Sequence, residues 1–482
     1  MKTTTYFLGV CLILLTACKN PTKLADPVTR STEYQSWEET TQPKGSPSYL
    51  AMGSYAKVLC SAVFVSGRDI DEAAVNSKMN LFSQEGVETK YSLDEEKKQV
   101  KVWIEGDTSR SATFYGDQGC IIDREEGINF DPVEVKSALG PAEEISWPMG
   151  DQLSEDMPEI NASTYQVVLD SAFDEKAYTA AFLVIKDGQI ILEKYGQGAH
   201  KDMQLESWSM GKSLTATLIG RLIQQGELSL EQKAPVEEWQ AEGDPRAEIS
   251  IRNLLNMSSG LRFAAHRDPD RTIPLIMLPH IYIYMEALDV FDFSINRPLE
   301  YVPGSTGRYR NCDPLTLGKI IRDKVEAKGE NYHQWPQKVL FDKVGIRKQV
   351  LETDINGNFI MTGFDYATAR NWGRIAMLYL QDGMWEGERL LPEGYSDFVS
   401  TPGPGWNPPE YGGLFWLNTT GRWKDLPENA YFMGGGGGQR VIISPSDNLA
   451  IIRMGHSRGE RYSDAALNAA ITELMKLLKA EI

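Results

Sequence analysis

The apolar and polar positions of the chain predict a mixed α/β protein whose clearest elements lie in its second half. Residues 181–192 contain two apolar runs around an Asp-Gly pair, which is the pattern of a hairpin between two strands. Strand-like sequence recurs over residues 439–453, and an amphipathic helix is expected over about residues 464–480. We therefore expect the core to span residues 161–482.

A further helix is expected to begin at or just before Ser209. Leu214, Leu218 and Leu222 follow it at helical spacing. Lys212 lies three residues after Ser209, and residues i and i+3 share one face of a helix, so its amine is expected to reach the hydroxyl. The positive end of the helix and burial would both lower the pKa of this lysine, toward a value at which the neutral amine accepts a proton.

The Ser-x-x-Lys spacing alone is weak evidence. One or two such matches are expected by chance in about 480 residues, and a second one is present at Ser54 and Lys57. The ordinary interpretation of an isolated match is a serine that caps a helix and a lysine in solvent. Ser209 is the stronger candidate because further motifs follow it.

The N-terminus is typical of an exported protein. Lys2 precedes an apolar run that is too short to remain as a membrane-spanning helix. Residues 15–18 (Leu-Thr-Ala-Cys) look like a bacterial lipobox. We therefore expect a lipoprotein signal peptide over residues 1–17, a lipid on Cys18, and a polar tether over residues 18–47. An ordinary cleaved signal and a soluble product is the alternative.

The net charge and the cysteine content bear on the expected partners, location and disulfides. The formal net charge of −18 disfavours nucleic acid and anionic lipid as partners, so attachment to the membrane would rest on the lipid. The expected location is the bacterial cell envelope, on a periplasmic or outer-surface side. In an oxidising compartment a disulfide between Cys60 and Cys120 is plausible, and a pair of free thiols is equally so. Cys312 is interpreted as a small buried residue.

Residues 48–160 lie outside the expected core. Within them, residues 90–93 and 100–104 are strand-like and flank a charged turn, which suggests a β-hairpin. We expect this region to be an N-terminal accessory segment, and the sequence assigns it no chemical role.

Several motifs follow Ser209 in a characteristic order. They lie at residues 254–261 (Leu-Leu-Asn-Met-Ser-Ser-Gly-Leu), 303–304 (Pro-Gly), 309–311 (Tyr-Arg-Asn), 368–374 (Thr-Ala-Arg-Asn-Trp-Gly-Arg), 378–383 (Leu-Tyr-Leu-Gln-Asp-Gly) and 433–439 (Met, five Gly, Gln). Together they resemble the serine β-lactamase and penicillin-binding superfamily. The resemblance is strongest to its class C-like esterase, peptidase and amide-hydrolase branch, including 6-aminohexanoate-dimer hydrolase-type proteins. It covers about residues 165–478.

The resemblance implies an α/β (α+β) fold, with an antiparallel sheet flanked by helices and a helical subdomain over about residues 230–400. It places the site in the cleft between them. Four aromatic residues are expected either to shape this cleft or to lie in the core: Trp406, Tyr411, Phe415 and Trp416.

The resemblance also implies the roles of individual residues. Ser209 would be the nucleophile, with Lys212 and Tyr309 as the pair that handles the proton. A phenol beside an ammonium gains from losing its proton, and coupled groups titrate as a unit, so neither is singled out as the base. Asn311 matches the Asn of the family's Tyr-x-Asn motif and would hold the lysine and a substrate carbonyl.

The glycine run supplies the last part of the implied site. Met433 and Gly435 occupy the first and last positions of the family's Lys-Thr-Gly or His-x-Gly triad. Gly436 would donate its backbone N–H to the oxyanion, beside that of Ser209. A thioether at Met433 replaces the usual cation or imidazole, which favours esters or neutral amides over penicillins. Arg440 is a candidate to replace that charge.

The sequence thus predicts a lipid-anchored serine hydrolase that cleaves an ester or amide and needs no cofactor or metal. The alternatives are a β-lactamase or D-amino-acid peptidase, and a non-catalytic binding or sensor protein on the same fold. Gly-x-Ser-x-Gly and His-Glu-x-x-His motifs are absent from the sequence. Each histidine is interpreted as a surface or structural residue: His200, His266, His280, His333 and His456.

Overall fold

The computed structural model describes residues 23–28, 43–77, 88–153, 165–196, 198–268, 275–286 and 288–480. The expected signal peptide and Cys18 lie outside these residues, so both stay predictions. Within the described ranges, no helix combines the length and apolar content needed to cross a membrane.

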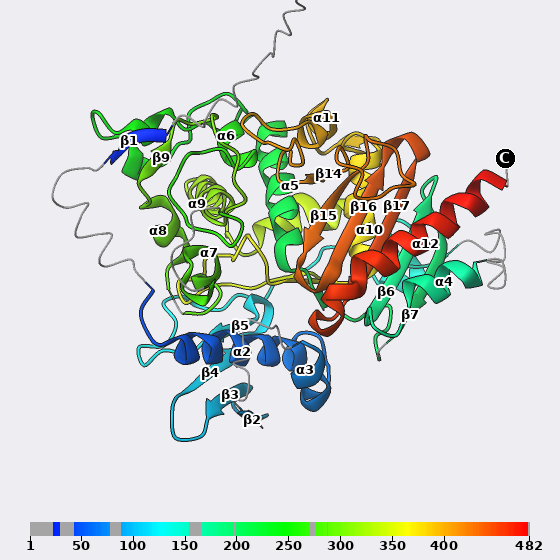
Figure 1. Ribbon diagram of the computed structural model, residues 1–482, viewed down its shortest axis with the longest axis horizontal. Helices are drawn as coiled ribbons and strands as arrows, with labels where there is room; N and C mark the ends of the chain where they lie inside the picture. The colour runs from blue at the N-terminus through cyan, green and yellow to red at the C-terminus, as the bar shows by residue number, and fades with distance from the viewer. Residues whose placement is uncertain are drawn as a thin grey trace, which may run out of the picture.

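A six-stranded antiparallel sheet forms the centre of the core (Figure 1). Two strands of this sheet, the first two along the core sequence, form the hairpin predicted around Asp187 and Gly188. The φ angles of these two residues are 50° and 81°. Both values are positive, as tight hairpin turns require. In spatial order the strands are β14 (Trp416–Leu417), β15 (Tyr431–Gly435), β16 (Gln439–Ser444), β17 (Leu449–Gly455), β6 (Thr179–Lys186) and β7 (Gln189–Tyr195).

Helices cover both faces of this sheet. The C-terminal helix α12 (Glu460–Ala480) and α4 (Gln166–Ala172) pack on one face, and α10 (Ala369–Leu380) packs on the other. Successive residues of β17 therefore enter two different clusters: Ile451 packs with the side chains of α12, and Ile452 with those of α10. This arrangement confirms the predicted antiparallel sheet flanked by helices.

The region beside the sheet is mostly helical. Helix α5 (Gly211–Gln224) runs through the middle of the molecule and is buried along most of its length, because other helices and loops surround it (Figure 1). The other helices here are α6 (Ile251–Leu255), α7 (Pro279–Tyr282), α8 (Val290–Ile295), α9 (Cys312–Glu326) and α11 (Tyr395–Ser400). Small antiparallel sheets link β10 (Val350–Leu351), β11 (Asp365–Ala367) and β8 (Leu205–Glu206), and β12 (Met384–Trp385) with β13 (Glu388–Arg389).

The accessory region forms its own layer at the bottom of Figure 1. Helices α2 (Pro47–Phe64) and α3 (Ile70–Asn76) pack beside a four-stranded sheet of β2 (Thr89–Asp94), β3 (Gln99–Ile104), β4 (Ser109–Phe114) and β5 (Cys120–Ile122). Strands β2 and β3 pair where the sequence predicts a hairpin. A disulfide joins Cys60 to Cys120, which decides between the two alternatives that the sequence left open, and Cys312 is buried with a free thiol.

The segment expected to be a tether contains one strand. β1 (Lys23–Val28) pairs antiparallel with β9 (Leu299–Tyr301) at the edge of the helical region. These six residues are therefore bound to the core, which differs from the free tether expected for residues 18–47.

Candidate active site

Ser209 lies in a strained turn directly before helix α5. A short 3₁₀ helix (Trp208–Met210) leads into α5, and Trp208 has a φ of 46°, a left-handed conformation that is costly for a bulky residue. Ser207 and Asp365 hold the turn: the Ser207 N–H donates to the Asp365 carbonyl (2.8 Å), and the Asp365 N–H donates to Ser207 Oγ (3.2 Å). Ser209 stays half-buried while its neighbours are buried, so its hydroxyl faces the open pocket.

Lys212 is in contact with Ser209, as the spacing predicts. Its Nζ lies 3.0 Å from Ser209 Oγ and donates to the carbonyl oxygen of Thr362 at 3.1 Å. The side chain is fully buried. Burial lowers the pKa of Lys212 well below its usual value of 10.5, and the nearby Asp365 carboxyl opposes this only in part. The geometry therefore favours a neutral amine beside the hydroxyl.

Tyr309 approaches the same two residues from the loop before α9. Lys212 Nζ is 4.8 Å from the centre of its ring, and the phenol is a hydrogen-bond partner of Ser209. Burial raises the pKa of Tyr309 to about 12, and the hydrogen bond with Ser209 opposes this only in part. The sequence argument left the base unassigned within the Lys212–Tyr309 pair, and burial of both groups favours the protonated phenol and the neutral amine. Here a neutral amine and a protonated phenol flank the serine.

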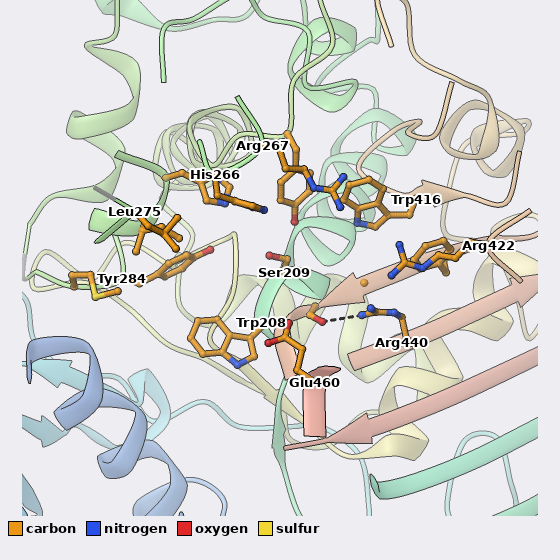
Figure 2. Close-up of a pocket in the computed structure, with 18 residues that line it drawn as sticks. Trp208, Ser209, His266, Arg267, Leu275, Tyr284, Trp416, Arg422, Arg440 and Glu460 are labelled. Atoms are coloured by element: carbon orange, nitrogen blue, oxygen red, sulfur yellow. Dashed lines mark hydrogen bonds between the residues drawn. The ribbon is translucent and has the colours of Figure 1, made fainter. Parts of the chain in front are cut away.

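Ser209 and Tyr309 line a cavity of about 470 Å³ (Figure 2), and Lys212 is buried behind Ser209, outside the lining. One half of the cavity wall is mostly apolar and comes from Trp208 and residues 275–285. The other half, beside Trp416, is charged. The lining also includes Leu275, Ile281, Tyr284, Met285, Arg267, Arg422, Phe432, Gly434, Gly435, Gly436, Arg440 and Glu460.

The glycine run borders this cavity beside Ser209. Gly435 sits so close to the serine turn that a methyl group on it would lie 2.1 Å from the carbonyl oxygen of Ser207. Gly434, Gly435 and Gly436 all line the pocket. The structure thus brings Gly435 and Gly436 to the positions at which the sequence predicts a substrate contact.

Met433 is not among the pocket-lining residues. Successive residues of a strand point to opposite faces, and on β15 the pocket face belongs to Phe432 and Gly434. The Met433 side chain is fully buried in the core. The expected contact between Met433 and a substrate is therefore missing, although the pocket face of β15 still offers neither a lysine nor a histidine.

Asn311 is close to the site but also outside the pocket lining. It is fully buried, and its Nδ2 donates to the carbonyl oxygen of His280 at 2.6 Å. The Lys212 amine instead bonds to Thr362. Asn311 thus supports the segment that carries His280, and its amide is directed to that segment rather than to the lysine.

Comparison with known proteins shows the family to which this chain belongs. A family model described as Beta-lactamase matches residues 168–475, which is more than half of the chain. The chain belongs to the beta-lactamase family. This confirms the resemblance to the wider superfamily of serine hydrolases inferred from the motifs.

Similar individual proteins are more distant. A 6-aminohexanoate-dimer hydrolase from Paenarthrobacter ureafaciens is 24% identical over 238 residues, which cover 48% of this chain and 59% of that protein. The match therefore spans about three fifths of that relative's length. A solved structure from Bacillus anthracis, provisionally described as a 6-aminohexanoate-dimer hydrolase, has a TM-score of 0.53 at 19% identity and covers 72% of this chain and 88% of its own. EstCE1, a hydrolase with promiscuous acyltransferase activity, has a TM-score of 0.51 at 16% identity, with 65% and 98% covered. The two structures show a shared fold.

Two histidines of this beta-lactamase-family site were missed by the sequence analysis. His266 and His280 both line the pocket, and the His280 ring centre lies 5.6 Å from that of Tyr309 and 5.3 Å from that of His266. Burial lowers the pKa of His280 well below its usual value, so its imidazole is neutral. No local spacing links these residues to residue 309, and the sequence therefore carried no signal for them.

The expected aromatic residues divide between pocket and core. Trp416 lines the pocket, and its ring centre lies 5.0 Å from that of Tyr309. Tyr411 is buried behind both rings, and Trp406 packs against Tyr411. Phe415 is a fully buried core residue.

The second Ser-x-x-Lys match has a structural role. Lys57 is buried in α2, and its Nζ lies 2.7 Å from Glu352 Oε2. Its amine also donates to the carbonyl oxygen of Cys120. Ser54 is fully buried within the same helix. Lys57 thus joins the accessory region to the core and lies outside the pocket lining.

Proposed function

We propose that the protein is a serine hydrolase that cleaves an ester or amide bond through a covalent acyl-enzyme on Ser209. The observation that carries this proposal is the 3.0 Å separation of the buried Lys212 Nζ from Ser209 Oγ, where Ser209 itself lines a cavity of about 470 Å³. A serine hydroxyl is a poor nucleophile unless a base is positioned beside it. A buried amine with a lowered pKa meets that requirement.

The reaction proceeds in two halves. Ser209 Oγ attacks the substrate carbonyl carbon while its proton passes to the Lys212 amine. The protonated phenol of Tyr309 gives a proton to the leaving alcohol or amine and recovers one from Lys212. Water then attacks the acyl-enzyme, and the same pair carries its proton to the departing Ser209 Oγ.

The negative oxygen of each tetrahedral intermediate needs hydrogen-bond donors. The backbone N–H groups of Ser209 and Gly436 are the proposed donors. The close approach of Gly435 to Ser207 supports this assignment, since it sets Gly436 at the cavity wall next to the serine turn. Loss of one such donor typically lowers the rate on the order of a hundredfold or more.

A covalent serine probe tests the proposal. A fluorophosphonate should label the wild-type protein at one serine, and Ser209→Ala should abolish the labelling. Ser54→Ala is the matched control, because Ser54 also precedes a buried lysine by three residues, and it should leave the labelling unchanged. An unlabelled wild-type protein would favour the non-catalytic binding or sensor protein.

A penicillin-recognising enzyme is the second candidate, a β-lactamase or a D-amino-acid peptidase. Arg267, Arg422 and Arg440 line the charged half of the pocket, where a substrate carboxylate can bind. The pocket face of β15 carries Phe432 and Gly434 in place of the family's cation or imidazole, which favours the ester or amide hydrolase. A chromogenic cephalosporin separates the two: we expect slow turnover, and rapid turnover would support the penicillin-recognising enzyme.

We also propose that the protein is held at the bacterial cell envelope by a lipid on Cys18. The lipobox-like residues 15–18 support this, and the net charge of −18 disfavours attachment through anionic lipids. On expression in a bacterium, the wild-type protein should fractionate with membranes and Cys18→Ala should not. Equal partition of the two proteins would contradict the anchor.

A further inference from the structure

The apolar half of the pocket is built by one short segment of the chain. Leu275, Ile281, Tyr284 and Met285 all line the cavity (Figure 2). In Figure 2, Leu275 and Tyr284 lie on the side of Ser209 opposite to Trp416 and Arg422. An apolar group next to the scissile bond would therefore contact residues 275–285, and the position of this segment sets the space available to it.

The hydrolase core holds this segment at two polar points. The Tyr284 hydroxyl donates to the carbonyl oxygen of Thr362 at 3.0 Å. Asn311 Nδ2 donates to the carbonyl oxygen of His280 at 2.6 Å. Both bonds hold the side of the segment that faces the catalytic residues.

The accessory region holds the opposite side. Arg110, on strand β4, donates from Nη1 and Nη2 to the two carboxylate oxygens of Glu286, at 3.1 and 2.8 Å. The two side chains are only 5% and 8% exposed, so this ion pair is almost completely shielded from solvent. The Arg110 guanidinium also stacks 4.0 Å above the ring of Tyr49. A bidentate pair in this setting fixes both distance and orientation.

Helix α2 touches the same segment through its backbone. A methyl group on Gly53 would lie 2.5 Å from the carbonyl oxygen of Met285, a pocket-lining residue. The helix therefore packs directly behind the apolar wall. Two elements of the accessory region thus meet two adjacent residues of the segment.

We propose that the accessory region, residues 48–160, sets the shape of the apolar half of the pocket, and that Arg110 and Glu286 are positioning residues that select substrates with an extended apolar group. This inference rests on the proposed hydrolase function of the pocket. Neither residue lines the cavity. Both act through the backbone that carries Tyr284 and Met285.

Removal of the Arg110 guanidinium weakens the hold on the buried Glu286 carboxylate. Arg110→Met keeps an unbranched apolar side chain but removes both bidentate hydrogen bonds, and the ion pair that Glu286 keeps with Arg124 is long, at 3.9 Å. A buried carboxylate held less tightly moves toward water. The segment moves with it, and a long chain loses the wall against which it packs. A short acyl group does not reach that wall, so kcat/KM for its ester should change little.

The test compares two p-nitrophenyl esters, the acetate and the octanoate. For wild-type protein, Arg110→Met and Glu286→Gln, kcat and KM are measured for both. We expect kcat/KM for the octanoate to fall on the order of tenfold or more, largely through KM, in both variants, with the acetate changed less than about twofold. Lys90→Met is the matched control: it breaks the exposed Lys90–Glu105 pair (3.0 Å) in the same sheet and should change neither ester.

Two outcomes overturn the inference. One is an unchanged ratio of octanoate to acetate kcat/KM in both variants, and the other is an equal fall for both esters. Hydrogen exchange supplies a measurement that is independent of catalysis: Arg110→Met should speed exchange in residues 275–286 and leave residues 205–215 unchanged. A wild-type protein that cleaves neither ester counts against the proposed function, whereas unaltered exchange in residues 275–286 counts against the inference alone.

Discussion

At the scale of single residues, burial decides where the protons of the site reside. Lys212 and Tyr309 are basic and acidic groups that share one dry environment, and burial disfavours the charged form of each. The same effect keeps His280 neutral. The resting site is therefore a set of neutral hydrogen-bonding groups around Ser209, ready for charge to develop as the reaction proceeds.

This arrangement predicts the pH dependence of the reaction. Catalysis needs the neutral amine of Lys212, so kcat/KM should rise with pH and level off above a lysine pKa that burial has moved below 10.5. Tyr309 should not limit the alkaline side until about pH 12, because its pKa is raised. The measurement is kcat/KM for p-nitrophenyl acetate between about pH 4 and about pH 10. A rate that climbs without a plateau to the end of that range would contradict a lowered lysine pKa.

Single residues of the site also show which contacts could be predicted from the sequence and which could not. The contact of Ser209 with Lys212 was predictable because it is local, three residues apart on one helix. The position of Met433 was not, because a shift of one residue along a strand exchanges the pocket face for the core face. His280 was missed since its place beside Tyr309 depends on how distant loops pack.

At the scale of elements, the close approach of β15 to the serine turn positions the proposed oxyanion donors. Strand β15 can lie against Ser207 only because residue 435 has no side chain. The turn itself carries the strained Trp208 and so depends on the contacts that surround it. Any group added between strand and turn should therefore disturb Gly436 and Ser209 together.

Gly435→Ala tests this contact. Its methyl group would lie 2.1 Å from the Ser207 carbonyl oxygen, so the strand must move. We expect fluorophosphonate labelling of Ser209 to slow on the order of a hundredfold, with the free energy of unfolding reduced by about 1–3 kcal/mol. Labelling kinetics and urea unfolding measure the two effects.

Gly140→Ala is the matched control, because a methyl group there meets nothing within 4 Å. It should leave both quantities within error of the wild-type values. Wild-type labelling kinetics in Gly435→Ala would mean that the glycine run serves another purpose.

Elements near each other in sequence were the ones that the sequence could predict. The β6–β7 hairpin needs only two apolar runs and an Asp-Gly turn, and helix α12 needs only its own periodicity. The neighbour of β6 on its other side is β17, whose paired residues lie more than 260 positions away. Local patterns hold no information on such a pairing, and the sheet became predictable only through the resemblance to a family.

At the scale of the whole molecule, the accessory region is joined to the core by several buried polar contacts. Glu352, in the core, accepts hydrogen bonds from Ser61 Oγ (2.6 Å) and from the Cys120 N–H (2.8 Å), and pairs with Lys57. The Arg110–Glu286 pair adds a second connection. Removing one partner of such a buried pair typically costs about 3–5 kcal/mol, so the two parts should unfold together.

The disulfide between Cys60 and Cys120 lies next to the contacts with Glu352, and its removal should lower stability without changing the site. It closes a loop of 60 residues and restricts the unfolded chain, which for this length corresponds to about 4 kcal/mol. The contacts of Ser61, Lys57 and Arg110 remain in the double variant Cys60→Ala/Cys120→Ala. We therefore expect urea unfolding to shift by about that amount, while kcat/KM for p-nitrophenyl acetate at 25 °C stays within about twofold. A shift below about 1 kcal/mol would show that the unfolded chain is already compact, and a large loss of acetate activity would show that the bond also shapes the catalytic residues.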